Sequence, residues 1–178
     1  MDKKMKKKSL MAVIWVAVVA VLIFIDIISK YLITANLDLG QKIDVIPGFF
    51  SLYHVVNKGS AFSFLADKAW GIYVLTAFSV VMGIALFVLM IYTAGNGFKV
   101  ISFALSLLSA GAFGNLIDRI RLGHVIDFLR FDFGSYTFPI FNFADICAVC
   151  GTIIIISAGV FANKYFDAYI NSIRKKKE

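Results

Sequence analysis

Long apolar runs separated by short polar stretches dominate the pattern of this chain. Uncharged runs lie between Lys8 and Asp26, Lys68 and Lys99, Lys99 and Asp118, and Asp145 and Lys164. A helix of roughly 20 apolar residues crosses a hydrocarbon core. We therefore predict an all-α integral membrane protein, a single membrane domain over residues 1–178 with four transmembrane helices at about 10–33, 70–92, 99–118 and 142–163.

The stretches between these helices have a different pattern. Residues 35–68 hold short apolar bursts interrupted by glycine and proline, among them Gly40, Pro47 and Gly59. Such interruptions favour small strands over another crossing. We expect this segment to form a small extracytoplasmic β-rich unit between helices 1 and 2, on the membrane surface. A second outer segment, about residues 119–140, leads into the fourth helix.

Charged residues are scarce, at 16% of the chain, and their distribution predicts an orientation. Five lysines lie in the first eight residues, and the chain ends Arg-Lys-Lys-Lys-Glu. With four crossings both termini share one side, which the positive-inside rule assigns to the cytoplasm. The first apolar run exceeds a signal-peptide core and no small-residue cleavage site follows it, so we expect it to be retained. The net charge of +7 then reflects topology, and no nucleic-acid partner is expected.

Two aspartates stand directly beside the apolar runs. Asp127 and Asp145 flank the connection between the third and fourth helices, so antiparallel packing brings them to the same membrane depth. Two poorly solvated carboxylates share one proton, and such a pair can activate water while donating to a carbonyl oxygen. A proton or cation path would use the same groups. Asp132, between them, is interpreted as a solvated loop acid.

Other polar residues also gather toward the predicted outer side. Asp26 and Lys30, spaced i and i+4, share a helix face and can pair, either as a structural anchor or as part of a site. Asn57 and Gly59 indicate a turn. This one-sided distribution favours an enzyme over a transport subunit, because a conduction path needs polar residues through the membrane depth. A non-enzymatic scaffold would leave the converging polar residues unexplained.

The third predicted helix ends in the sequence GNLIDR. Its Asp118 and Arg119 form either a simple interfacial charge cluster or a site in which Arg119 orients another carboxylate. Gly111 and Gly114, beside Asn115, allow close helix packing. We also expect these two glycines to leave room for the backbone of a substrate.

Motifs of other active-site types are missing from the sequence. His54 and His124 stand alone, and the chain has no H-E-x-x-H, no G-x-S-x-G and no phosphate-binding glycine loop. Cys147 and Cys150 fall within the fourth predicted helix, where free thiols are expected. We predict that no metal or organic cofactor is used.

Four motifs in order, DIISK, NKGSAF, GAFGNLIDRIRLGHVIDF and FPIFNFADI, resemble those of bacterial lipoprotein signal peptidase, or signal peptidase II. The resemblance implies an aspartyl endopeptidase of the bacterial cytoplasmic (inner) membrane with its active site on the outer face. Such enzymes cleave prolipoproteins immediately before a cysteine that carries a diacylglyceryl group, within membrane lipid, and are inhibited by the cyclic peptide globomycin. The implied catalytic pair is Asp127 and Asp145, and the implied supporting residues are Asp26, Lys30, Asn57, Gly59, Asn115, Asp118, Arg119 and Asn142.

The sequence departs from the family pattern at a few positions. Ser60 stands where the family usually has alanine, and DIISK lacks the more familiar glutamine and threonine. A serine adds one hydroxyl and little volume, so we expect activity to persist, while the role of position 60 stays open. The aromatic residues of the outer segments, Phe49, Phe50, Phe62 and Phe64, either clamp the substrate or pack on the membrane surface.

Overall fold

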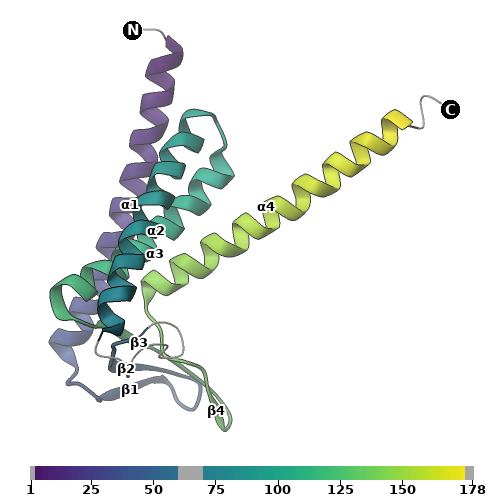
Figure 1. Cartoon of the computed structure of the whole chain (residues 1–178). Helices are drawn as coiled ribbons and strands as arrows, with labels where there is room; N and C mark the ends of the chain where they lie inside the picture. Colours follow the sequence, from purple (N-terminus) through teal and green to yellow (C-terminus); the bar gives the residue numbers. More distant parts are fainter. Residues whose placement is uncertain (1–2, 60–69, 175–178) are drawn as a thin grey trace.

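Four long helices form a bundle, and a small antiparallel sheet lies at one end of it (Figure 1). The computed structural model describes residues 3–59 and 70–174, with side chains for residues 8–59 and 70–161. The helices are α1 (Lys3–Asn36), α2 (Gly71–Gly95), α3 (Lys99–Leu122) and α4 (Phe143–Arg174). Each contains a segment long and apolar enough to cross a membrane, namely Lys8–Asn36, Gly71–Gly95, Lys99–Leu122 and Phe143–Phe161. The predicted fold class is confirmed.

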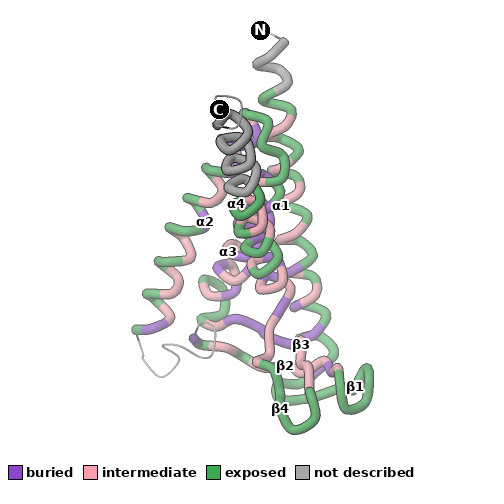
Figure 2. The backbone as a smooth tube through the Cα atoms, turned by 90° about the vertical axis from the view of Figure 1, so that its right-hand side faces the viewer, coloured by how far each residue is buried: buried purple, intermediate pink, exposed green. Residues whose placement is uncertain are grey.

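Helix α3 is the centre of the bundle. About 56% of its most apolar window is buried inside the protein, against 11–17% for the other three helices. Its small residues Ala104, Ser106 and Ala110 are buried and let its neighbours approach closely. Figure 2 shows buried segments along α3 and in the strands at the end of the bundle. Most of the apolar surface of α1, α2 and α4 is therefore left for lipid.

The sheet combines the two connecting segments that the sequence keeps far apart. Its strands are β1 (Lys42–Ile46), β2 (Phe50–Asn57), β3 (Val125–Phe133) and β4 (Tyr136–Thr137), in the order β1-β2-β3-β4. The predicted strands between the first two helices are confirmed. The pairing of β2 with β3, which sets Val55 opposite Asp127, was not predicted. Asp127 therefore lies on a strand that pairs with β2, and this pairing fixes its position.

A glycine turns the chain from α3 into β3. Gly123 adopts a left-handed conformation with φ of 74°, and its N–H donates to the carbonyl of Arg119 at 3.1 Å. This helix ending is typical of glycine, which carries no Cβ. The strand begins two residues later at Val125, so Asp127 follows the end of α3 closely.

The beginning of α4 packs tightly on α3 at two glycines. A Cβ at Gly111 would lie 2.5 Å from the carbonyl oxygen of Ala144, and a Cβ at Gly114 would lie 2.6 Å from Oδ2 of Asp26. Both separations are too short for real atoms, so only glycine fits at these positions. Asp26 and Ala144 fill the space at Gly114, so the expectation that it leaves room for a substrate backbone is wrong there, whereas Gly111 also lines the cavity beside α4.

Candidate active site

Asp127 points from β3 into the space between the sheet and the helices. Its side chain is buried, and each carboxylate oxygen accepts a hydrogen bond from an amide. Asn57 on β2 donates to Oδ2 at 3.0 Å, and Asn142 donates to Oδ1 at 2.7 Å. The two amides come from segments far apart in the sequence, so the carboxylate is fixed by the tertiary structure.

Asp145 lies in the first turn of α4, where it belongs to a reciprocal helix cap. The backbone N–H of Asp145 donates to Oδ1 of Asn142, and the backbone N–H of Asn142 donates to Oδ2 of Asp145, both at 3.1 Å. This is the geometry of a capping box. The other oxygen, Oδ1, accepts a hydrogen bond from Asn115 of α3 at 2.8 Å. The cap therefore also orients the carboxylate.

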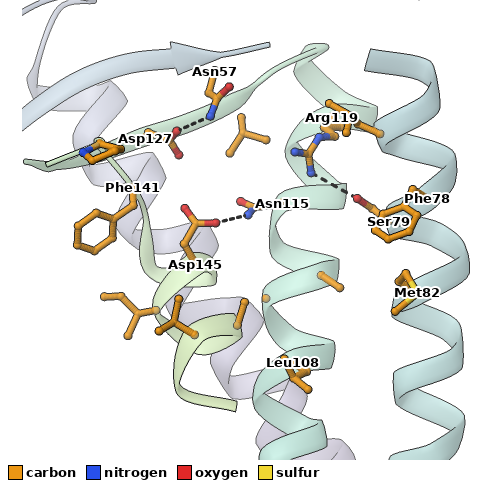
Figure 3. Close-up of a pocket in the computed structure, with 18 of the residues that line it drawn as sticks. Asn57, Phe78, Ser79, Met82, Leu108, Asn115, Arg119, Asp127, Phe141 and Asp145 are labelled. Atoms are coloured by element: carbon orange, nitrogen blue, oxygen red, sulfur yellow. Dashed lines mark hydrogen bonds between the residues drawn. The ribbon is translucent and has the colours of Figure 1, made fainter. Parts of the chain in front are cut away.

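The two carboxylates face the same space, one from β3 and one from α4 (Figure 3). Burial raises the pKa of Asp127 to about 7, and the negative charge of Asp145 contributes to the rise against the opposing hydrogen bonds from Asn57 and Asn142. A large fraction of Asp127 therefore keeps its proton at neutral pH. A raised pKa at one member is what two close carboxyl groups that share one proton would show.

A buried cluster of charges lies behind the pair. The ammonium group of Lys30 contacts Oδ2 of Asp26 at 2.8 Å and Oδ2 of Asp118 at 2.9 Å, and it donates to Oδ1 of Asn115 at 3.1 Å. Asp26 also accepts the backbone N–H of Ala144 at the start of α4. The cluster therefore joins α1, α3 and α4, and the predicted Asp26–Lys30 pair is present.

Asp118 and Arg119 are adjacent in sequence but take part in different interactions. Asp118 accepts the backbone N–H of Ile126 as well as contacting Lys30. Arg119 donates to the carbonyl of Gly59 at 3.2 Å and to the hydroxyl of Ser79 on α2 at 3.4 Å. Neither a simple Asp118–Arg119 cluster nor a hydrogen bond from Arg119 to a carboxylate is present in the described part of the chain. Arg119 instead connects α3 to α2 and to the turn after β2.

The turn after β2 is tied to Asp127 through Asn57. Oδ1 of Asn57 accepts the backbone N–H of Gly59 at 2.9 Å, while its amide nitrogen donates to Asp127. The predicted turn is therefore present, and the same asparagine that forms it also contacts Asp127. Ser60, Phe62 and Phe64 lie outside the described residues.

A cavity of about 1090 Å³ opens beside the two carboxylates, between α2, α3 and α4. Its polar lining is gathered at one end, where Asn57, Asn115, Arg119, Asp127 and Asp145 face it. The rest of the wall is apolar, with residues such as Phe78, Met82, Leu86, Leu108 and Val149. A largely apolar pocket with a few convergent polar groups is typical of a ligand site.

The aromatic residues of the outer segments are divided between two places. Phe138 and Phe141 line the cavity. Phe49 and Phe50 do not, and they pack instead on Phe131, with ring centroids 5.5 and 4.8 Å apart. Phe131 in turn stacks on Phe141 at 5.8 Å. Phe49 and Phe50 therefore support the cavity wall from behind and do not clamp its contents directly.

The remaining candidates lie away from the carboxylate pair. Asp132 is accessible to solvent, as predicted, but it lies on β3 and not in a loop, and it forms an ion pair with Arg130 at 3.0 Å. Cys147 and Cys150 are free thiols as predicted, and Cys150 lines the cavity. No group of three His, Cys, Asp or Glu residues suited to a metal ion occurs among the described residues.

Sequence reasoning missed two features of this site. Ser79 lies in an uncharged helix, and nothing in its sequence neighbourhood indicates that it meets Arg119. Asn142 is a candidate site residue only through the family resemblance. An asparagine followed three residues later by an aspartate is nevertheless a pattern typical of a helix start, and the observed cap matches it.

Comparison with known proteins gives consistent matches. The family model described as Signal peptidase (SPase) II matches residues 18–161. Lipoprotein signal peptidase of Listeria monocytogenes serotype 4a is 37% identical, over 75% of this chain and 84% of its own length. That of Cupriavidus taiwanensis is 39% identical, over 80% of each chain, and that of Psychromonas ingrahamii is 37% identical, over 84% of this chain and 86% of its own.

Solved structures match as well. A bacterial membrane enzyme determined by the in meso method at 2.3 Å resolution superposes with a TM-score of 0.74 and 33% identity, over 84% of this chain and 88% of that one. A second, at 1.9 Å resolution, gives a TM-score of 0.68 and 32% identity. The matches confirm the resemblance that the four sequence motifs carry.

Proposed function

This chain belongs to the signal peptidase II family of bacterial membrane aspartic peptidases, and on that premise we propose that Asp127 and Asp145 are its catalytic pair. The substrate is a prolipoprotein whose cysteine carries a diacylglyceryl group, and the bond cleaved is the one immediately before that cysteine. The observation that carries the proposal is that both carboxylates face the polar end of an apolar cavity between membrane helices.

The chemistry follows from the shared proton. One carboxylate takes a proton from a water molecule as the water attacks the scissile carbonyl carbon, and the other donates its proton to the carbonyl oxygen. As the tetrahedral intermediate collapses, the first carboxyl passes the proton it took from water to the leaving amine, and the C–N bond breaks. The second carboxylate takes back a proton from a hydroxyl of the intermediate as the carbonyl re-forms, so the pair ends with one proton, as it began. Asn57, Asn115 and Asn142 hold the carboxylates in position throughout.

The cavity provides a binding site suited to such a substrate. A signal peptide and acyl chains are apolar, and they meet an apolar wall formed by α2, α3 and α4. Arg119 faces the polar end, where peptide carbonyl groups would lie. A proton or cation path is less well supported, since the deeper wall holds residues such as Leu86, Leu108 and Val149.

The orientation in the membrane rests on charge. Lysines at both ends of the chain favour cytoplasmic termini and an active site on the outer face. The experiment is to compare the accessibility of single introduced cysteines at Lys42 and at Asn96 in intact cells. Labelling of the first alone supports this orientation, and labelling of the second alone contradicts it.

Globomycin is expected to occupy the cavity, and Cys150 provides a native probe. Alkylation of Cys150 by N-ethylmaleimide should slow when globomycin is bound, because this thiol lines the cavity. Cys150→Ser should remain unlabelled, since the other thiol, Cys147, is buried. An unchanged labelling rate with saturating inhibitor would place globomycin elsewhere.

The catalytic pair is tested by Asp127→Asn and Asp145→Asn. Each should lower the cleavage rate of a diacylglyceryl-modified precursor by about 10²–10⁴-fold, the usual contribution of a general acid or base. Asp132→Asn, an aspartate on the same strand paired with Arg130, is the matched control and should retain activity. Full activity of either site variant, in protein shown to be folded in the membrane, would refute the proposal.

A further inference from the structure

Three asparagine amides surround the carboxylate pair, and two of them are held in one orientation by backbone donors. Oδ1 of Asn57 accepts the N–H of Gly59, and Oδ1 of Asn142 accepts the N–H of Asp145. A backbone N–H can only donate, so the NH₂ group of each amide must point away from it. Both NH₂ groups therefore point to Asp127, at 3.0 and 2.7 Å.

The third amide, Asn115, is oriented by a side chain. Its Oδ1 accepts from the ammonium of Lys30 at 3.1 Å and from the amide nitrogen of Asn142 at 3.0 Å. Its own NH₂ donates to Oδ1 of Asp145 at 2.8 Å. Reversing this amide would set NH₂ against two donors and Oδ1 against a carboxylate, so all three hydrogen bonds would be lost. Lys30 and Asn142 together therefore select the face that Asn115 presents to Asp145.

Lys30 cannot act on the substrate directly. Its side chain is 2% exposed and does not line the cavity. Its ammonium has three N–H donors and three acceptors, from Asp26, Asp118 and Asn115. The only one of these partners that reaches a carboxylate of the pair is Asn115. Any influence of Lys30 on the reaction therefore passes through that amide or through the field of its charge.

We propose that Lys30 is a positioning residue for the reaction: through the amide of Asn115 it fixes the orientation of the Asp145 carboxylate beside the cavity. Both oxygens of Asp145 accept N–H donors, from Asn115 and from the backbone of Asn142. Asp145 also lies in the first turn of α4, where the helix N-terminus stabilises negative charge. This inference rests on the proposed function.

Other charges near Asp145 do not provide this link. Arg119 carries a charge that acts on Asp145, Asp127 and Asp118. In the described part of the chain, however, it makes its hydrogen bonds to Gly59 and Ser79 and none to Asp145.

The test is the split between kcat and KM in Lys30→Gln and Lys30→Arg. Lys30→Gln removes the cationic donor to Asn115, so kcat should fall about tenfold, the size expected when a hydrogen bond to a charged group is lost, while KM changes little. Lys30→Arg keeps a cationic donor and should recover most of kcat, and Lys42→Gln, an exposed lysine paired with Asp44, is the matched control.

A second variant keeps the test decisive if Lys30→Gln does not fold. Asn115→Asp has the same shape and keeps an acceptor for Lys30, but turns an oxygen toward Asp145. It should also lower kcat with little change in KM. An unchanged kcat per folded enzyme in these variants overturns the inference, since a merely structural role lowers the amount of folded enzyme without altering its turnover. If Asp127→Asn or Asp145→Asn is active in parallel assays, the proposed function itself fails.

Discussion

Asp127 and Asp145 are both aspartates beside apolar sequence, but their surroundings differ. Asp127 is almost fully buried on a strand and receives two side-chain amides. Asp145 is half-buried at the start of a helix and receives one amide and one backbone N–H. Burial disfavours a charged carboxylate, whereas a helix N-terminus favours it. The two members of the pair are therefore not equivalent.

This difference predicts the alkaline limb of the pH profile. The pKa of Asp127 is raised to about 7, so its proton is lost as the pH rises through that value. If Asp127 is the acid, kcat/KM should fall about tenfold per pH unit above the limb. The measurement is kcat/KM on a lipidated precursor in buffered detergent. A profile that stays flat from neutral into mildly alkaline solution would contradict this role.

Removing Asn57 should move the same limb in a defined direction. The hydrogen bond from Asn57 lowers the pKa of Asp127, so Asn57→Ala should raise it and shift the alkaline limb upward by roughly one pH unit. The control is Asn36→Ala, because Asn36 is exposed and donates only to a carbonyl in its own helix. A limb that moves downward or stays in place would show that the hydrogen bond does not act on Asp127 as described.

At the scale of elements, the site depends on how closely α4 begins against α3. Gly114→Ala would put a methyl group 2.6 Å from Oδ2 of Asp26 and displace the acceptor of the Ala144 N–H. We expect about 1–3 kcal/mol of destabilisation from overpacking, with reduced cleavage.

The matched control for this change is Gly159→Ala, farther along α4. A Cβ there meets nothing within 4 Å, so the substitution should leave cleavage unchanged and thermal stability equal or slightly higher. Thermal unfolding in detergent and cleavage rate are measured for both variants. Equal behaviour of the two would contradict the close approach at Gly114.

Helices and strands that depend on a local sequence pattern were predictable, and those that depend on long-range pairing were not. The four helices follow from uncharged runs that no water-soluble arrangement could bury, and the strands of 42–57 from interrupted apolar bursts. The strand β3 was missed because its partner, β2, lies about 70 residues earlier and no local pattern encodes that pairing. The extension of α3 to Leu122 could have been found, since Gly123 is an evident helix terminator.

In the candidate site, too, contacts set by local spacing were predictable and contacts set by tertiary packing were not. The spacing of Asp26 and Lys30 predicts their pairing, because i and i+4 fix one helix face. The third member, Asp118, comes from another helix, and its contact with Lys30 follows only from packing of α1 on α3. The resemblance supplied the identities of Asn57 and Asn142, whereas their fixed amide orientations come from backbone donors visible only in three dimensions.

At the scale of the whole molecule, a largely apolar cavity with polar groups at one end links the site to the membrane. Under the proposed function, a substrate anchored in the same lipid would reach this cavity by lateral diffusion, and its acyl chains would add apolar contact area. Unlipidated precursor should therefore be cleaved at least about tenfold more slowly at equal concentration in vesicles. Gel or mass analysis of both precursors measures this, and equal rates would contradict recognition of the lipid.

We propose that Asp127 and Asp145 act as one catalytic unit sharing a proton. The most direct measurement is kcat on a lipidated precursor for Asp127→Asn, Asp145→Asn and the double variant. Residues that act as a unit show strongly non-additive losses. We predict that each single variant loses nearly all activity and that the double variant falls little further. Losses that multiply in the double variant, or substantial activity in either single variant, would contradict the claim.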